Sequence, residues 1–220
     1  MSQLVLIGAG GHGRGTLEIL KARRRAGYEV PEIAGFVDDS ADDGDRSIGG
    51  VPLLGKVEWL LRRVDDGYQA IIALASSAAK KKIAQRLDQR GIAWQTAVHP
   101  SAIIGEGTSI GAGAIIGAGV VIAYDTVIGC HTTINLNATV GHDCRIGDYS
   151  TVAPGVNITG NVSLGECVEI QTNATLVPGL VIGREVGIGP GSVVLRDLAE
   201  GQQVFGNPAR PVPTPTKVTR

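Results

Sequence analysis

The sequence predicts a small α/β domain followed by a parallel β-helix, and three observations lead to this fold class. An aliphatic residue recurs at every sixth position from residue 102 to residue 197. Before residue 98, short apolar segments alternate with segments of helical pattern. The first apolar segment runs directly into a glycine-rich stretch at residues 8–13. We therefore expect an α/β domain at 1–97, a β-helix at 98–197, and a C-terminal turn and tail at 198–220.

The N-terminal elements follow from this alternation, which is typical of a small parallel sheet with helices packed on it. We expect strands at residues 4–7, 33–37, 70–75 and 93–98, helices at 14–26, 56–64 and 78–90, and a loop at 49–55. Four strands amount to half of a doubly wound sheet. Such a half-Rossmann-like domain has room for one nucleotide rather than for a dinucleotide such as NAD.

The glycine-rich stretch is the candidate phosphate site. Gly10, Gly11 and His12 lie between the first strand and the first helix, where backbone N–H groups and the positive helix end favour an anion. Asp38 and Asp39 end the next strand, the place from which a carboxylate reaches a ribose in nucleotide-binding sheets. The alternative is a tight strand-to-helix turn that binds nothing.

The six-residue repeat starts at Ala102, and its period fits neither a helix nor an alternating strand. It predicts a triangular coil of three hexads, so that residues eighteen apart stack at about 4.8 Å, the ordinary strand spacing. Glycine, asparagine and aspartate in the later places of each hexad suit corners with positive φ. The inward third places are all aliphatic: Ile104, Ile110, Ile116, Ile122, Ile128, Ile134, Val140, Ile146, Val152, Ile158, Leu164, Ile170, Leu176, Ile182, Ile188 and Val194.

His142 and Asp143 occupy the fifth and sixth places of their hexad and are therefore expected to point outward at a corner. By the eighteen-residue stack, His142 has Tyr124 below it and Gly160 above it. This column offers a base, a carboxylate that orients it, and an uncovered backbone N–H, the set needed for attack on a thioester. The alternative is a solvated surface histidine.

Composition excludes several partner classes. The 220 residues carry a formal net charge of −1, so neither nucleic acid nor an anionic membrane is an expected partner. No segment approaches the length of a membrane span, and the N-terminus lacks a basic region and cleavage site, so we expect a cytoplasmic protein. Cys130, Cys144 and Cys167 show no metal-ligand spacing. The Pro- and Thr-rich segment 211–220 is expected to be disordered.

Several motifs occur together: the glycine-rich stretch, the Asp38-Asp39 pair, His-Pro-Ser-Ala at 99–102, the unbroken repeats, and Asn-Pro-Ala-Arg at 207–210. In this combination the chain, to about residue 212, resembles the sialic acid O-acetyltransferase/nucleotide-sugar N-acetyltransferase family of hexapeptide-repeat acyltransferases. That family includes enzymes that acetylate UDP-linked 4-amino sugars and the GDP-perosamine N-acetyltransferases. The resemblance implies a left-handed parallel β-helix and a homotrimer. It also implies a nucleotide-binding α/β domain, and acetyl-CoA bound between neighbouring β-helices.

The resemblance also implies roles for individual residues. The catalytic pair is His142, the base, with Asp143. Acceptor binding is assigned to Gly10, Gly11, His12, Asp38, Asp39 and Asn135, and acetyl-CoA binding to Gly160, Gly189, Asn207, Pro208 and Arg210. Two departures set this chain apart from the UDP-sugar type. Thr151 stands where that type has a second histidine, and Ala-Ser-Ser at 75–77 replaces a Gly-Asn-Asn stretch.

The function we expect is direct, acetyl-CoA-dependent N-acetylation of a nucleotide-linked amino-deoxy sugar, at C4, without a metal or redox cofactor. O-acetylation of sialic acid or a related hydroxyl is the alternative within the same chemistry. A covalent route through Cys144 is disfavoured, since that residue occupies an inward place. A zinc hydratase would need three histidine ligands, for which His99, His131 and His142 are the candidates. A non-enzymatic sugar-nucleotide sensor or scaffold would bind the same ligand without consuming acetyl-CoA.

Overall fold

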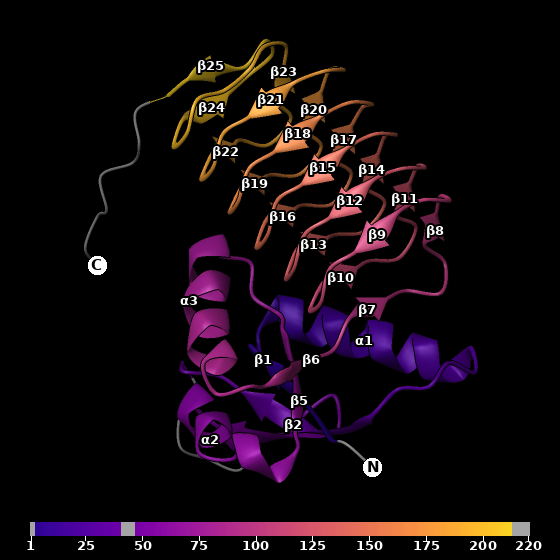
Figure 1. Ribbon diagram of the computed structural model, residues 1–220, viewed down its shortest axis with the longest axis vertical. Coiled ribbons are helices and arrows are strands. Elements are labelled where there is room, and N and C mark those ends of the chain that lie inside the picture. The colour runs from indigo at the N-terminus through magenta and orange to yellow at the C-terminus, as the bar shows by residue number, and fades with distance from the viewer. Residues whose placement is uncertain (1–2, 41–46, 213–220) are drawn as a thin grey trace.

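The computed structural model describes residues 3–40 and 47–212. It shows an α/β domain at one end of a long triangular β-helix (Figure 1). The predicted disorder of the C-terminal tail falls mainly on residues 213–220, which lie outside the described residues. No helix within the described ranges combines the length and apolar composition needed to cross a bilayer.

The α/β domain is built on a six-stranded sheet with the order β3-β4-β2-β1-β5-β6. Its strands are β1 (Gln3–Ile7), β2 (Glu32–Val37), β3 (Ser47–Ile48), β4 (Val51–Gly55), β5 (Gln69–Ile72) and β6 (Ala93–Trp94). All of its pairings are parallel except the short β3–β4 hairpin. The helices are α1 (Gly11–Arg25), α2 (Val57–Leu61), a 3₁₀ turn η1 (Val64–Asp66) and α3 (Ser77–Asp88).

Three of the predicted boundaries were wrong. Helix α1 begins at Gly11 and not at residue 14, so the glycine-rich stretch supplies its first turn. The predicted loop at 49–55 contains strand β4, which pairs with β2. The predicted strand at 93–98 is two strands: β6 joins the N-terminal sheet, while β7 (Ala97–Val98) pairs with the first coils of the β-helix.

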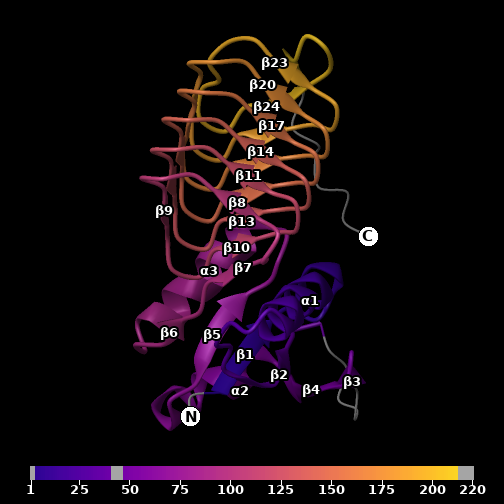
Figure 2. The same ribbon diagram turned by 90° about the vertical axis from the view of Figure 1, so that its right-hand side faces the viewer.

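The β-helix has three faces built from parallel strands of two residues, except for the three-residue β24 and the antiparallel β25 at its end, and the chain passes through the faces in turn (Figures 1 and 2). The eight-stranded face contains β7, β10 (Ile115–Ile116), β13 (Thr133–Ile134), β16 (Thr151–Val152), β19 (Glu169–Ile170), β22 (Gly187–Ile188), β24 (Gln203–Phe205) and β25 (Arg210–Pro211). The six-stranded face contains β8 (Ile103–Ile104), β11 (Val121–Ile122), β14 (Thr139–Val140), β17 (Asn157–Ile158), β20 (Thr175–Leu176) and β23 (Val193–Val194). The five-stranded face contains β9 (Ser109–Ile110), β12 (Val127–Ile128), β15 (Arg145–Ile146), β18 (Ser163–Leu164) and β21 (Val181–Ile182).

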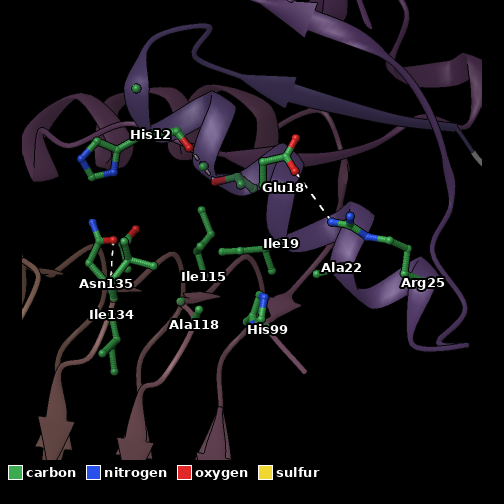
Figure 3. A pocket seen from close by; sticks show the side chains of 16 residues that line it. His12, Glu18, Ile19, Ala22, Arg25, His99, Ile115, Ala118, Ile134 and Asn135 are labelled. Carbon is green, nitrogen blue, oxygen red and sulfur yellow. Dashed lines mark hydrogen bonds and ion pairs between the residues drawn. The ribbon is translucent and has the colours of Figure 1, made fainter. Parts of the chain in front are cut away.

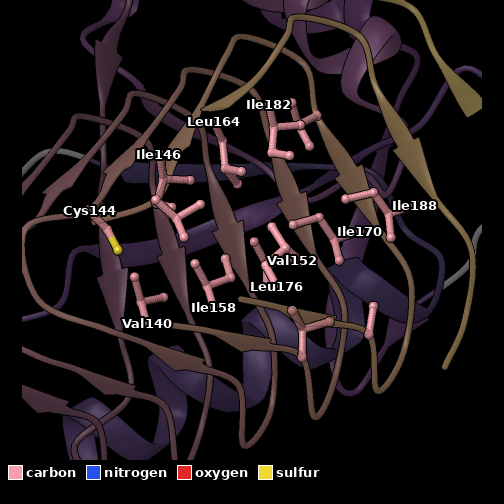
Figure 4. Packing of buried hydrophobic residues seen from close by; sticks show 14 of the residues in the cluster. Val140, Cys144, Ile146, Val152, Ile158, Leu164, Ile170, Leu176, Ile182 and Ile188 are labelled. Atoms are coloured by element: carbon pink, nitrogen blue, oxygen red, sulfur yellow. The ribbon is translucent and has the colours of Figure 1, made fainter. Parts of the chain in front are cut away.

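The predicted eighteen-residue stack is confirmed by the strand register. Val121 pairs with Thr139, and Thr139 pairs with Asn157. The third-place side chains fill the interior, where Val152 and Leu176 are fully buried (Figure 4). Burial of one such side chain stabilises the fold by about 1.5–3 kcal/mol, so the repeat supplies most of the apolar core.

Corners occur at one fixed place in the hexad. The sixth residue adopts φ between 53° and 79° from Gly107 to Gly191, a left-handed conformation that glycine, asparagine and aspartate tolerate. We call the corner after the eight-stranded face the first corner, the one after the six-stranded face the second, and the one after the five-stranded face the third. The third corner carries bulkier residues in this conformation: His131, Tyr149, Cys167 and Glu185.

One apolar cluster spans the junction between the two parts of the chain. Leu17 and Leu20 of α1 belong to one buried cluster with Ala97 and Ile115 on the eight-stranded face. Helix α1 therefore lies between the N-terminal sheet and the first coils (Figure 2). Because the contact is buried and apolar, the glycine-rich stretch at the start of α1 is held against the β-helix.

Candidate active site

His142 and Asp143 form an ion-pair geometry at the second corner. The Nδ1 atom of His142 lies 2.7 Å from Oδ2 of Asp143. An ionised carboxylate can only accept, so Nδ1–H donates and the Nε2 lone pair of a neutral imidazole is left free. The ring of Tyr124 stacks on the imidazole at 5.3 Å with 9° between the planes. His142 is thus an oriented base whose side chain is 43% exposed.

Gly160 lies next to that base, as the stack predicts. A Cβ built on Gly160 would meet Nε2 of His142 at 2.7 Å. The carbonyl oxygens of His142 and Gly160 make the regular hydrogen bonds between successive coils: Asn161 N–H donates to His142 O, and Gly179 N–H donates to Gly160 O. The Gly160 N–H makes no hydrogen bond among the described residues. A base therefore lies beside a residue whose backbone N–H is free, and acyl transfer uses a base and an oxyanion donor placed together.

Replacing Gly160 with alanine is expected to lower kcat by roughly 10–100-fold, because the new methyl group displaces the imidazole from the oriented position. The fold should survive, since the clash is with the end of an exposed side chain. Steady-state thiol release together with a thermal melt measures both. The control for kcat is Gly179→Ala, one coil further along the same corner, where a Cβ meets nothing within 4 Å; its φ of +79° makes alanine strained, so this variant should melt lower but keep its kcat. An equal loss of kcat in the two variants would contradict displacement of the His142 imidazole as the cause.

A cleft of about 470 Å³ lies between helix α1 and the first corner. In Figure 3, His12 and Asn135 face one another across it, while Ile19 and Ile115 form an apolar wall. The Oγ1 atom of Thr133, which also lines the cleft, is buried and has no partner among the described residues. Burial, and secondarily the nearby Lys80, lowers the pKa of His12, which favours the neutral ring.

The glycine-rich stretch is shaped to receive an anion. Gly8 has φ of +104°, and a Cβ there would meet Ala73 O at 2.7 Å, so no other residue fits. Helix α1 has no side-chain cap and no acidic residue in its first turn. The partial positive charge at the N-terminus of α1 is therefore available to an anionic ligand.

The two acids after β2 have structural contacts. Asp38 Oδ2 accepts from Ala9 N–H at 2.7 Å, and its Oδ1 accepts from Ser40 N–H and Oγ–H. Burial raises the pKa of Asp38, but these hydrogen bonds outweigh it and lower the pKa overall. Asp39 Oδ1 accepts from Val57 N–H at the start of α2. Asp38 therefore holds the glycine-rich stretch in place, and nucleotide binding by either acid stays a prediction.

The residues assigned to acetyl-CoA lie further along the β-helix. Gly189 is at the first corner, where a Cβ would meet the Phe205 ring at 2.5 Å. Asn207 and Pro208 lie in the turn between β24 and β25, and the exposed Arg210 begins β25. Gly189 is three coils beyond Asn135 on the same corner, about 14 Å at the strand spacing.

The structure does not bring all of these residues together within one chain. His142, Asp143 and Gly160 belong to the second corner, whereas Asn135, Gly189 and the α1 cleft belong to the first. One face of the triangle separates the two groups. None of His142, Asp143 and Gly160 lines the α1 cleft. Within one chain, the base and the α1 cleft therefore lie at different corners.

Lys80, which the sequence analysis did not single out, lies where α3 meets the eight-stranded face. Its Nζ donates to Ser150 O at 2.9 Å and to Thr151 Oγ1 at 2.8 Å. Thr151 Oγ1 in turn donates to Ala75 O at 3.0 Å. The two departures noted in the sequence, Thr151 and residues 75–77, are therefore in direct contact. No sequence signal marked Lys80, because Lys81 and Lys82 follow it in the same run.

The geometry is unfavourable to two of the alternatives. His99 is at the first corner, His142 at the second and His131 at the third, and the described ranges contain no cluster of three metal-ligating side chains. Cys144 is fully buried, and its Sγ lies 3.1 Å from Thr159 O. Burial is the main cause that raises the pKa of this thiol, so the nucleophilic thiolate is disfavoured.

Comparisons with known proteins match both parts of the chain. Residues 3–87 match the family model described as the PglD N-terminal domain, and residues 125–160 match that of the bacterial transferase hexapeptide (six repeats). The GDP-perosamine N-acetyltransferase of Escherichia coli O157:H7 is 31% identical over 212 residues, covering 93% of this chain and 94% of that protein.

Solved structures agree with this match. One is a perosamine N-acetyltransferase from Caulobacter crescentus with one histidine replaced by asparagine, in complex with CoA and GDP-perosamine. It has a TM-score of 0.88 and 31% identity, and the match covers 97% of this chain and 98% of that one. Another is the acetyltransferase domain of PglB from Neisseria gonorrhoeae FA1090 with acetyl coenzyme A, with a TM-score of 0.84, 28% identity, and coverage of 96% and 98%. Through this full-length similarity, the chain belongs to the nucleotide-sugar N-acetyltransferase family of hexapeptide-repeat transferases.

Proposed function

We propose that this chain transfers the acetyl group of acetyl-CoA to the amino group, at C4, of a nucleotide-linked amino-deoxy sugar in bacterial glycan biosynthesis. The observation that carries the proposal is the oriented pair His142–Asp143 beside the free N–H of Gly160. The full-length relative and the Caulobacter crescentus structure act on or bind GDP-perosamine, which supports an acceptor of this class.

The transfer is a single displacement. Nε2 of His142 takes a proton from the amine as the nitrogen attacks the acetyl carbonyl carbon and the C–N bond forms. The Gly160 N–H donates to the oxyanion of the tetrahedral intermediate. Collapse breaks the C–S bond, and the proton held by His142 passes to the CoA thiolate. Asp143 keeps the imidazole in the tautomer that can accept the proton.

The complete site is proposed to form between copies in a homotrimer. The second corner of one chain, with His142, would face the first corner and α1 cleft of its neighbour. The six-stranded face between these corners carries Ile103, which is 63% exposed, and Val121, which is 39% exposed. An apolar surface of this kind is suited to burial against another chain.

The acceptor is identified by incubation with acetyl-CoA and UDP-, GDP- or dTDP-linked 4-amino-4,6-dideoxyhexoses, followed by mass spectrometry. We expect one of them to gain a single acetyl group on nitrogen. A thermal-shift panel of UDP, GDP, dTDP and CMP compounds identifies the nucleotide, because a ligand that binds the native state raises the midpoint. Acetylation of free sialic acid, with none of the amino sugars modified, would establish the O-acetyltransferase alternative instead.

A further inference from the structure

Lys80 is a buried ammonium without a carboxylate partner. Its side chain is fully buried at the junction of α3 and the β-helix. Its two contacts are neutral oxygens, those of Ser150 and Thr151, and no ion pair within 4.0 Å is found for it in residues 3–40 and 47–212. A buried charge that is only partly compensated costs free energy of folding.

The β-helix does not need this charge. Ser150 O also accepts from Thr133 N–H at 2.9 Å, as part of the regular ladder. Thr151 Oγ1 has its own bond to Ala75 O. Both oxygens would stay hydrogen-bonded without Lys80, so satisfying them does not explain why a positive charge lies here.

The position of Lys80 relates it to the anion cradle. Helix α3 starts at the carboxyl end of β5, and β5 pairs with β1, which leads into the glycine-rich stretch. Ligands of open α/β sheets bind in the crevice between two such strands. Lys80 is close enough to His12, in the first turn of α1, to lower the pKa of that imidazole. The loop before α3 connects the two places: a Cβ on Gly8 would meet Ala73 O at 2.7 Å, and Ala75 O accepts from Thr151 Oγ1, the hydroxyl that Lys80 contacts.

We propose that Lys80 is the buried counter-charge of the acceptor's diphosphate and that acceptor binding is coupled to uptake of a proton by its amino group. The inference rests on the proposed function, because it takes a nucleotide-linked acceptor as the ligand. Lys80 is a positioning residue in this scheme, because it acts through its charge and does not touch the reacting atoms.

The protonation of Lys80 supports this coupling. Burial lowers its pKa to about 7, against the opposing influence of Glu169 and Cys167 on the β-helix. The other titratable groups whose pKa values respond to it are His12 on α1 and His131 at the third corner, and Lys80 lowers both. The amine is therefore partly neutral near pH 7 without ligand. Two negative charges nearby would raise its pKa and draw a proton from solvent.

Calorimetric titration at pH 8 in two buffers of different ionisation enthalpy measures the proton uptake. The probes are UDP-glucose, GDP-mannose, dTDP-glucose and CMP-sialic acid, so that each nucleotide is represented. A shift of one pKa unit, from about 7 to about 8, corresponds to uptake of about 0.4 proton per site. The bound diphosphate would raise the pKa of His12 as well, and any proton that His12 takes up would persist in the Lys80→Met variant.

Three variants separate charge from structure. Wild-type Lys80 is mostly neutral at pH 8 without ligand, so Lys80→Met, which keeps the apolar stem, should bind the probe about twofold more weakly and lose the uptake. Lys80→Arg stays charged, so it should bind the probe about fivefold more tightly than wild type and also lose the uptake, because arginine does not titrate here. The matched control is Lys81→Met, whose partner is Glu166 at 2.9 Å on the surface side of α3, and it should behave as wild type.

The outcomes distinguish the two proposals. Binding of a probe to wild type without proton uptake overturns the role of Lys80 and leaves the proposed function intact. Uptake that persists in Lys80→Met assigns the proton to another group and equally overturns it. Failure of all four probes to bind wild type contradicts the nucleotide-linked acceptor itself.

Discussion

Replacement of His142 by alanine is expected to lower kcat by about 10²–10⁴-fold, the range for loss of a general base. Affinity for both substrates should change little, because the imidazole accepts a proton rather than holding either ligand. A variant of the Caulobacter crescentus enzyme with one histidine replaced by asparagine forms a complex with CoA and GDP-perosamine. Thiol release at saturating substrates gives kcat, and thermal shift gives binding.

The melting temperature of His142→Ala distinguishes loss of the base from unfolding of the protein. The side chain of His142 is 43% exposed and the core beneath it is made by other residues, so the melting temperature should stay close to that of wild type. Arg145→Ala, an exposed change three residues away on β15, is the control and should keep its activity. A well-folded His142→Ala variant that retains more than a tenth of the wild-type kcat would mean that the proton leaves by another route.

Co-expression of two inactive variants is expected to restore about one quarter of the wild-type activity, the fraction of randomly assembled sites that are intact in both halves. One variant is His142→Ala, which lacks the base. The other is Gly11→Asp, which puts a carboxylate at the phosphate cradle. Aspartate is compatible with the fold there, because a Cβ on Gly11 meets nothing within 4 Å and a negative charge suits the start of α1.

The expectation follows from the separation of the two corners. Each complete site needs His142 from one chain and an unblocked α1 cleft from its neighbour, and a mixed trimer can provide both. Differentially tagged chains purified in tandem, followed by a rate measurement, provide the test; this purification keeps only mixed trimers, each with one intact site in three, so the purified sample should show about one third of the wild-type activity. Mixing the two variants after separate purification is the control and should give no recovery while the trimers stay assembled. Co-expressed chains that remain as inactive as each variant alone would mean that the site is complete in one chain.

The β-helix could be read from the sequence because each hexad repeats the same local physics. An inward aliphatic such as Ile158 and a left-handed corner at Asn161 recur with a fixed period, so every copy supports the same interpretation. The N-terminal domain has no such redundancy. Val51–Gly55 was read as a loop because of its glycines and proline, yet pairing with β2 makes it a strand. Tertiary pairing overrides local propensity in a segment this short.

The candidate site was predicted in part. The stack placed Tyr124, His142 and Gly160 in one column, since that relation depends only on the period. That Asn135 and His142 lie on different corners was not drawn from the sequence, although they are only seven residues apart. Lys80 was missed because its burial depends on how α3 docks on the β-helix. A run of three lysines carries no sign of which one is covered.

The eighteen-residue stack also fixes the distance along the β-helix between any two residues at the same corner. Changes in chain length are tolerated only in whole turns, because a six-residue deletion would rotate every later residue to the next face. Removing residues 162–179 would keep each face in register and move Gly189 and Asn207 one layer, about 4.8 Å, nearer to His142. The covalent structure of CoA fixes the distance from its thioester to its nucleotide end. With the thioester at His142 and the nucleotide end at Gly189 and Asn207, as proposed, the number of turns between them would set the length of the acyl carrier that the enzyme accepts.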